Sequence, residues 1–192
     1  MDIEAYALLN MTCADGKHSR SHGLASSVLR RQAAAVDIPL VQRSAGDGEY
    51  EREFKKILRE FRETGTTYGV FGDIDLAAHR EWIERVCAEV KITPVFPLWL
   101  YNRRDMIDEF SGAGFRAVIV SVLEEKIDKK YLGRNYDSEF IEELQSSGDL
   151  DLCGENGEFH TFVYNGPIFS KPVRFSTGKV FKKDKYNILD LL

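Results

Sequence analysis

The chain has 192 residues, of which 43% are hydrophobic and 30% charged, a composition typical of a folded globular protein. Its net charge of −5 and pI near 5.5 argue against a general binder of nucleic acid or anionic membranes, but they allow a single nucleotide held by local donors. No apolar run approaches the roughly 20 residues of a membrane-spanning helix, and the acidic start MDIEAYALLNM is unlike a signal peptide. Three widely spaced cysteines, Cys13, Cys87 and Cys153, predict a reduced cytoplasmic protein without structural zinc.

Strand and helix patterns alternate over residues 1–100. Short apolar runs predict strands at residues 6–11, 38–41, 67–71 and 94–96. Apolar residues spaced one helical turn apart predict helices at residues 24–36, 54–61 and 76–90. This alternation indicates right-handed crossovers and a parallel sheet with helices on both faces, so residues 1–100 are expected to form an α/β nucleotide-binding domain.

Residues 101–192 are expected to form a smaller α+β lobe that binds the substrate. The expected elements are a short helix at residues 106–110, a central strand at 115–122, a helix at 140–144 that Asp137 or Ser138 caps, and short strands at 161–164 and 173–175. Turns are expected at Asn165-Gly166-Pro167 and Thr177-Gly178. Five lysines near the end could form an RNA-binding edge. The simpler interpretation is a charged guard on an exposed hairpin, that is, lysines whose charge keeps the hairpin edge from pairing with another chain.

Polar residues follow three of the predicted strands, at the carboxyl ends where open parallel sheets bind ligands. They are Asn10-Met11-Thr12, Gly72-Asp73 and Tyr101-Asn102-Arg103. Each alone reads more simply as a helix cap or turn, but convergence on one crevice would make a binding site. Four scattered histidines have no metal-ligand spacing, and no nucleophile elbow is present, so neither a metal site nor a catalytic triad is predicted.

The stretch CGENGEFHTFVYNGPIF at residues 153–169 is the most unusual in the chain. A surface turn needs glycine and polar residues, but it does not need Glu155, Glu158, His160 and Thr161 gathered before an apolar strand. We therefore interpret this stretch as a site rather than a turn.

Several motifs, in order along nearly the whole chain, resemble the diphthine–ammonia ligase (diphthamide synthase) family of PP-loop ATP pyrophosphatases, with their adenine nucleotide alpha-hydrolase-like fold. Residues 154–161 are similar to the family's G-E-G-G-E-[YF]-E-T, and Gly166-Pro167-Ile168-Phe169 to its G-P-[LI]-F. Weaker matches are residues 7–11, His22, residues 69–73 and 80–86, Pro97-Leu98-Trp99 and Tyr131-Leu132-Gly133-Arg134.

The resemblance implies an ATP-dependent ligase. A substrate carboxylate attacks the α-phosphate, pyrophosphate leaves, and ammonia displaces AMP from the acyl-adenylate. The implied partners are ATP with Mg²⁺, ammonia, and a carboxylate on a small molecule or a modified protein side chain, and the chain could form a homodimer. The implied ATP site comprises Asn10, Met11, His22, Gly72 and Asp73. The implied substrate site comprises Arg134, Gly154, Glu155, Asn156, Gly157, Glu158, His160 and Thr161. No catalytic residue is assigned.

Two departures from the family pattern limit what the resemblance implies. The S-G-G-K-D-S phosphate loop is not in the chain, so we expect a Rossmann-like domain that lacks its first strand, loop and first helix, about 25–30 residues, with Met1 as an internal methionine. His160 replaces a glutamate and Asn156 a glycine, so the substrate need not be diphthine.

Two other functions stay open. The chain could be a non-catalytic adenine-nucleotide-binding protein that has lost the phosphate loop. A tRNA-modifying enzyme of the same superfold is less favoured, because neither a cysteine pair nor a basic face is evident.

Overall fold

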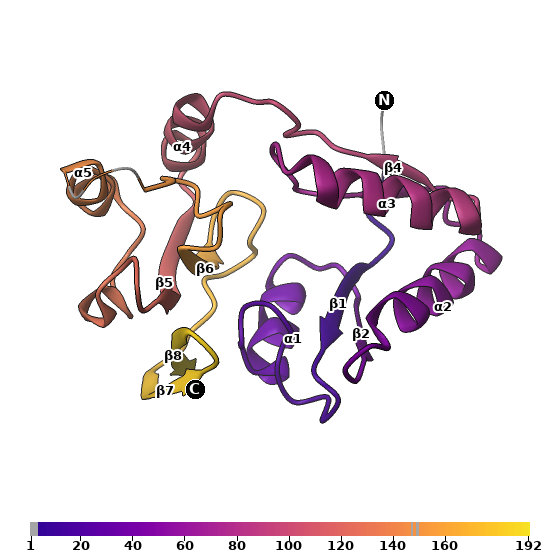
Figure 1. Ribbon diagram of the computed structural model, residues 1–192, viewed down its shortest axis with the longest axis horizontal. Coiled ribbons are helices and arrows are strands. Elements are labelled where there is room, and N and C mark those ends of the chain that lie inside the picture. Colours follow the sequence, from indigo (N-terminus) through magenta and orange to yellow (C-terminus); the bar gives the residue numbers. More distant parts are fainter. Residues whose placement is uncertain (1–3, 147, 149) are drawn as a thin grey trace.

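A computed structural model describes residues 4–146, 148 and 150–192 (Figure 1). Its helices and strands are β1 (Leu8–Thr12), α1 (Ser26–Ala35), β2 (Leu40–Ser44), α2 (Tyr50–Glu63), β3 (Tyr68–Val70), α3 (Ala77–Val90), β4 (Thr93–Val95), α4 (Arg103–Gly112), β5 (Arg116–Leu123), a short 3-10 turn (Lys129–Tyr131), α5 (Ser138–Ser146), β6 (Phe159–Asn165), β7 (Thr177–Lys183) and β8 (Tyr186–Leu191). The predicted helices and most of the predicted strands are therefore present, with ends that differ by a few residues.

The N-terminal half contains two separate pairs of parallel strands. β1 pairs with β2 from Leu8↔Leu40 to Thr12↔Ser44, and β3 pairs with β4 from Tyr68↔Thr93 to Val70↔Val95. Among the described residues no ladder joins the two pairs, so the single parallel sheet expected from the alternation is divided in the middle. The mixed α/β class and the Rossmann-like strand–helix alternation are confirmed.

Helices α2 and α3 pack side by side against these strand pairs (Figure 1). Their apolar faces meet Met11 of β1 in one core, where Phe54 and Leu58 come from α2 and Val86 and Cys87 from α3. The spacing of Phe54, Ile57, Leu58 and Phe61 explains α2, because these positions lie on one face of a helix whose other face is charged.

Helix α1 belongs to a different core. Val28 on α1 is fully buried and packs in a cluster with Val118, Val120 and Phe162 of the C-terminal sheet and with Leu191 near the chain end. The two halves of the chain therefore share a core across α1, and they are not separated by a solvent layer there.

The C-terminal lobe is built on a four-stranded antiparallel sheet with the order β6-β5-β8-β7. The apolar strand β5 lies inside it, as its continuous run of buried residues predicts. α5 covers the face opposite α1, where Phe140 and Leu144 pack against Ile119, Val122 and Phe159. Asp137 caps α5 by accepting a hydrogen bond from the Phe140 N–H at 3.0 Å.

The end of the chain differs from the sequence expectation. Val173–Phe175 makes one ladder-like bond, from the Val173 N–H to the Tyr164 carbonyl, and forms no strand, while Thr177-Gly178 begins β7 instead of making a turn. The hairpin turn is at Asp184-Lys185, where Asp184 adopts φ 53°, a conformation that aspartate tolerates without the glycine that marks most such turns. Lys179, Lys182 and Lys183 lie on β7 at the sheet edge, which agrees with the charged-guard interpretation.

Of the helices in the described part of the chain, none combines the length and the apolar character needed to cross a membrane.

Candidate functional site: the groove and the loop beside it

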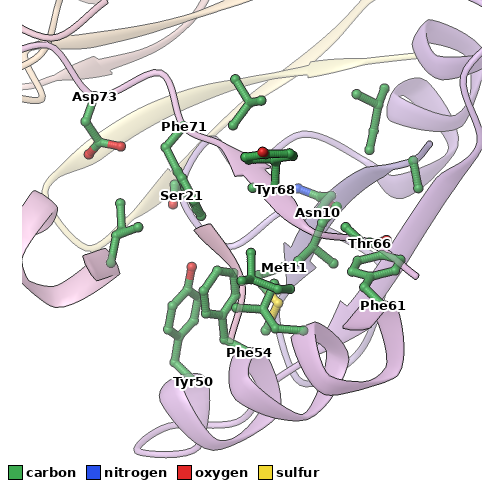
Figure 2. A pocket seen from close by; sticks show the side chains of 18 of the residues that line it. Asn10, Met11, Ser21, Tyr50, Phe54, Phe61, Thr66, Tyr68, Phe71 and Asp73 are labelled. Atoms are coloured by element: carbon green, nitrogen blue, oxygen red, sulfur yellow. The ribbon is translucent and has the colours of Figure 1, made fainter. Parts of the chain in front are cut away.

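A groove of about 1190 Å³ runs between β1 and β3, with α2 and α3 as its floor. Figure 2 shows Tyr68 and Phe71 on one side of it, and Met11, Phe54 and Tyr50 on the other. Its lining is mostly apolar, so a planar aromatic group of a ligand could bury its apolar surface against the groove walls.

Consecutive residues line this groove on both sides: residues 4–11, which lead into β1 and run along it, and residues 68–71, which are β3 and the residue after it. Side chains on a strand alternate between faces, so an unbroken run of lining residues means that the groove follows the strand edges. β2 and β4 occupy the outer edges of β1 and β3. The inner edges therefore face each other across the groove.

Polar side chains gather at the end of the groove that corresponds to the carboxyl ends of the strands. Ser21, His22, Asp73 and His79 line it there. Nδ1 of His79 lies 3.4 Å from Oδ1 of Asp73. This is the edge at which parallel α/β sheets bind ligands.

The two halves of the molecule meet beside this end through a pair of histidines. The ring centroids of His22 and His160 are 4.6 Å apart, and His160 also contacts the Tyr186 ring. Burial lowers the pKa of His22, and burial together with the neighbouring His22 lowers the pKa of His160 to about 4. Both imidazoles are therefore neutral at pH 7. Gly23 lets this loop approach the sheet, because its φ is 69° and a Cβ there would lie 2.7 Å from Ile188 Cδ1.

The loop at residues 151–158, here called the motif loop, is ordered by its own carboxylates. Asp151 is buried and accepts hydrogen bonds from the Cys153 N–H at 3.0 Å and the Glu155 N–H at 2.7 Å. Glu158, also buried, accepts one from the Asp151 N–H at 3.3 Å, while its Oε2 atom has no hydrogen-bond partner. Gly154 has φ 68°, and a Cβ there would lie 2.7 Å from the Phe159 carbonyl oxygen.

The motif loop contacts the loop that follows β3. Oε1 of Glu155 accepts a hydrogen bond from the Ile74 N–H at 3.0 Å. The Arg103 guanidinium lies between the same two segments, with NH2 2.9 Å from Asp75 and Nε 3.4 Å from Oδ1 of Asp151. The polar features expected after the third and fourth strands thus come together, and Asn102 caps α4 by accepting from the Arg104 and Asp105 N–H groups.

The structure gathers most of the expected ATP site. Asn10, Met11, His22 and Asp73 line the groove, and Gly72 is the exposed residue between the lining residues Phe71 and Asp73. The Asn10 side chain is held by Gln42 Nε2 at 3.2 Å, and Met11 is packed in the core.

The expected substrate residues divide into two groups. Gly154, Glu155, Asn156, Gly157 and Glu158 form the motif loop, and His160 and Thr161 follow on β6. Arg134 is committed elsewhere. Its guanidinium pairs with Glu143 at 2.7 Å and Glu139 at 3.3 Å on α5, and it lies over the Tyr131 and Phe140 rings.

Sequence reasoning did not single out Asp151 or the groove aromatics. Asp151 organises the motif loop, yet nothing in its local spacing distinguishes it from a surface residue. Tyr50 and Tyr68 line the groove because of how α2 and β3 pack, and no local pattern reports that.

No set of three or more histidine, cysteine, aspartate or glutamate side chains suited to a metal ion occurs in the portion of the chain that the structure describes. Three carboxylate residues, Glu4, Glu51 and Asp73, line the groove. Glu51 is already paired with Lys55 and Arg85, and Asp73 is the one that lies at the polar end. Mg²⁺ bound to a nucleotide needs only one or two protein carboxylates besides the phosphates, so Asp73 fits that role.

Comparison with known proteins identifies relatives. Residues 1–94 match the family described as "Diphthamide synthase N-terminal domain", and residues 102–191 match "Diphthamide synthase C-terminal domain". Proteins named diphthine--ammonia ligase from Homo sapiens and Bos taurus are each 27% identical over 138 residues, which is 70% of this chain and 52% of each relative. The protein of that name from Schizosaccharomyces pombe is 24% identical over 198 residues, or 92% of this chain and 33% of the relative. The chain thus spans about half the length of the mammalian relatives it matches.

Proposed function

Because the chain belongs to the diphthamide synthase family, we propose that it performs ATP-dependent amidation of a carboxylate with ammonia, releasing AMP and pyrophosphate. One observation supports this proposal above the others. The polar end of the groove and the motif loop are joined by the hydrogen bond from Ile74 to Glu155, so a nucleotide in the groove would lie beside the loop that resembles the family's substrate motif.

In the proposed reaction the groove holds the nucleotide and the motif loop faces the acceptor carboxylate. The adenine would stack among apolar side chains such as Phe71, and backbone at Asn10 and Met11 would supply polar contacts. Asp73 would hold Mg²⁺ against the phosphates. The substrate carboxylate displaces pyrophosphate from the α-phosphorus, and ammonia then attacks the acyl carbon and releases AMP. Bringing carboxylate and nucleotide together in one crevice supplies the main rate advantage.

We further propose that one more parallel strand fits between β1 and β3. The S-G-G-K-D-S loop of the family does not occur in these 192 residues, and the two inner strand edges that flank the groove have no strand partner among the described residues. A strand bearing such a loop would complete a five-stranded sheet and place backbone N–H groups at its carboxyl end, where the phosphates would lie.

The substrate need not be diphthine. His160 and Asn156 replace a glutamate and a glycine of the family motif, and the neutral His160 leaves the pocket with one negative charge fewer. We also propose a reducing cytoplasmic setting, which agrees with the absence of disulfides among Cys13, Cys87 and Cys153.

Thermal unfolding with ATP and Mg²⁺, compared with AMP, tests the proposal, together with an assay for released pyrophosphate. A ligase is expected to prefer ATP and, when extended at its N-terminus by a strand with the phosphate loop, to release pyrophosphate in the presence of ammonia and an acceptor carboxylate. Equal binding of ATP and AMP with no pyrophosphate from either form would contradict it. That outcome would favour the non-catalytic nucleotide-binding protein.

A further inference from the structure

We propose that Glu155 is a positioning residue, which holds the nucleotide-side loop at residues 72–75 against the motif loop so that the two halves of the site act as one unit. This inference rests on the proposed function for its catalytic meaning. The physical claim about the two loops stands on the contacts alone.

Two hydrogen bonds, one at its N–H and one at its carbonyl, hold the backbone of Ile74 in place. Its N–H donates to Oε1 of Glu155 at 3.0 Å, and its carbonyl accepts from the Leu100 N–H at 2.7 Å. The Ile74 side chain is buried. Asp73, whose carboxylate lines the groove, is the adjacent residue. Fixing Ile74 therefore fixes the direction in which Asp73 enters the groove.

The contacts around Glu155 form a closed ring. Ile74 donates to Glu155, the Glu155 N–H donates to Asp151, Asp151 pairs with Arg103, and Arg103 pairs with Asp75 next to Ile74. The ring joins Ile74 and Asp75 of the N-terminal half to Glu155, Asp151 and Arg103 of the C-terminal half. Three of these contacts are hydrogen bonds to charged groups, and the fourth, between Arg103 Nε and Asp151, is an ion pair without a hydrogen bond. Several such contacts together resist local opening better than a single contact does.

The position of Glu155 distinguishes this role from direct contact with a substrate. One of its carboxylate oxygens is occupied by a backbone donor from the other half of the chain, and the side chain is not part of the groove lining. A carboxylate that binds a ligand directly needs acceptor oxygens that no other part of the protein occupies, whereas one oxygen of Glu155 is already bonded to Ile74.

Amide hydrogen exchange of Ile74, measured by NMR on the full chain, tests the proposal. Glu155→Ala removes the acceptor and is expected to speed exchange at Ile74 at least about tenfold, the effect of losing roughly 1.4 kcal/mol of local stability. Glu155→Gln keeps an acceptor oxygen and is expected to preserve protection. Asn156→Ala, at the exposed next position, is the matched control and should leave Ile74 unchanged. Unchanged exchange in Glu155→Ala would overturn the proposal.

Titration with ATP and Mg²⁺ separates positioning from direct contact. Positioning predicts that Glu155→Ala weakens nucleotide binding several-fold while Glu155→Gln binds like the unaltered protein. Equal weakening by both variants shows that the charge itself is needed and overturns the proposal. If the unaltered protein binds no nucleotide, the proposed function fails, and the exchange measurement still decides whether Glu155 joins the loops.

Asp75→Asn provides a second variant should Glu155→Ala fail to fold. It weakens the Arg103 side of the ring while leaving Glu155 intact. Faster exchange at Ile74 supports the ring, and unchanged exchange contradicts it.

Discussion

The two halves of the molecule bury their strands in different ways. In the C-terminal half, four antiparallel strands form one sheet with a packed core on each face, from α1 on one side and α5 on the other. In the N-terminal half, two parallel pairs face each other across an apolar groove, and α2 and α3 supply the core on one side. The strands of the C-terminal half are therefore the better buried of the two sets.

This difference assigns separate physical roles to the two halves. A sheet covered on both faces provides a rigid base for the motif loop. A groove with apolar walls and a polar end provides room for a ligand. Measurements that compare substitutions in the two halves can break or sharpen this division.

The largest effect is expected from the C-terminal core. Phe162 is 1% exposed and packs in the cluster that includes α1, so Phe162→Ala should lower the free energy of unfolding by about 3–5 kcal/mol. Tyr68, on the groove side, is 39% exposed, and Tyr68→Ala should cost less than about 1 kcal/mol. Urea unfolding measures both. Similar losses in the two variants would remove the contrast between a packed half and an open half.

Acid should weaken the contact between the halves. His160 has a pKa of about 4 in the folded protein against 6.5 for the ordinary imidazole, so between these pH values the unfolded chain binds a proton that the folded chain does not. The free energy of unfolding should fall by about 3 kcal/mol as pH drops through this window, and the lowered pKa of His22 acts in the same direction. The contribution of the neutral histidines to the free energy of unfolding is fully present above pH 6.5.

Variants identify the group responsible for this pH dependence. His160→Gln should flatten the dependence of unfolding free energy on pH between 6.5 and 4. A slope that persists in His160→Gln would show that other groups control it.

A smaller loss is expected when the motif loop is strained. Gly154→Ala places a Cβ 2.7 Å from the Phe159 carbonyl oxygen at φ 68°, which should cost about 1–3 kcal/mol. Gly112→Ala is the matched control, because a Cβ there meets nothing within 4 Å and the residue is helical, so that variant should be neutral or slightly more stable. Thermal unfolding of both variants checks the difference. Equal midpoints would indicate that the loop relaxes around the new methyl group.

The smallest effect is expected at the sheet edge. Lys182 pairs with Glu124, but both side chains are more than half exposed, at 56% and 51%. Lys182→Ala should change the free energy of unfolding by less than about 1 kcal/mol. Solubility at high protein concentration is the more sensitive readout, because β7 is an edge strand that its lysines protect. A large fall in stability would show that the pair does more than the exposure suggests.

Local patterns predicted much of the fold because its helices are amphipathic and its strands are apolar. The 3.6-residue period that places Phe54, Ile57 and Leu58 on one face is intrinsic to α2, and the β-branched run of β5 needs no partner to be recognised. The exposed hairpin was expected, but its turn was placed at Thr177-Gly178, because the actual turn at Asp184-Lys185 has no glycine. Val173–Phe175 was predicted to be a strand, although it forms none. Strand pairing depends on distant partners that a local pattern does not contain.

The candidate site was predictable to the extent that strand ends and motifs mark it. Asn10, His22 and Asp73 do line one groove. Arg134 was placed with the motif loop by resemblance alone, and the structure instead commits it to Glu139 and Glu143, since α5 presents two carboxylates within its reach. Asp151 escaped notice because its importance comes from backbone N–H groups that approach it only in the folded loop.

The shared core around α1 has a consequence for how the chain folds as it is made. Val28 is synthesised well before Val118, Phe162 and Leu191, which bury it and lie about 90 to 160 residues further along the chain. The apolar face of α1 therefore stays exposed to solvent during translation until these residues have been made. Contacts between residues so far apart in the sequence also form slowly. We expect a nascent chain arrested before β5 to be sensitive to protease at residues 26–35, and release of the finished chain to remove that sensitivity.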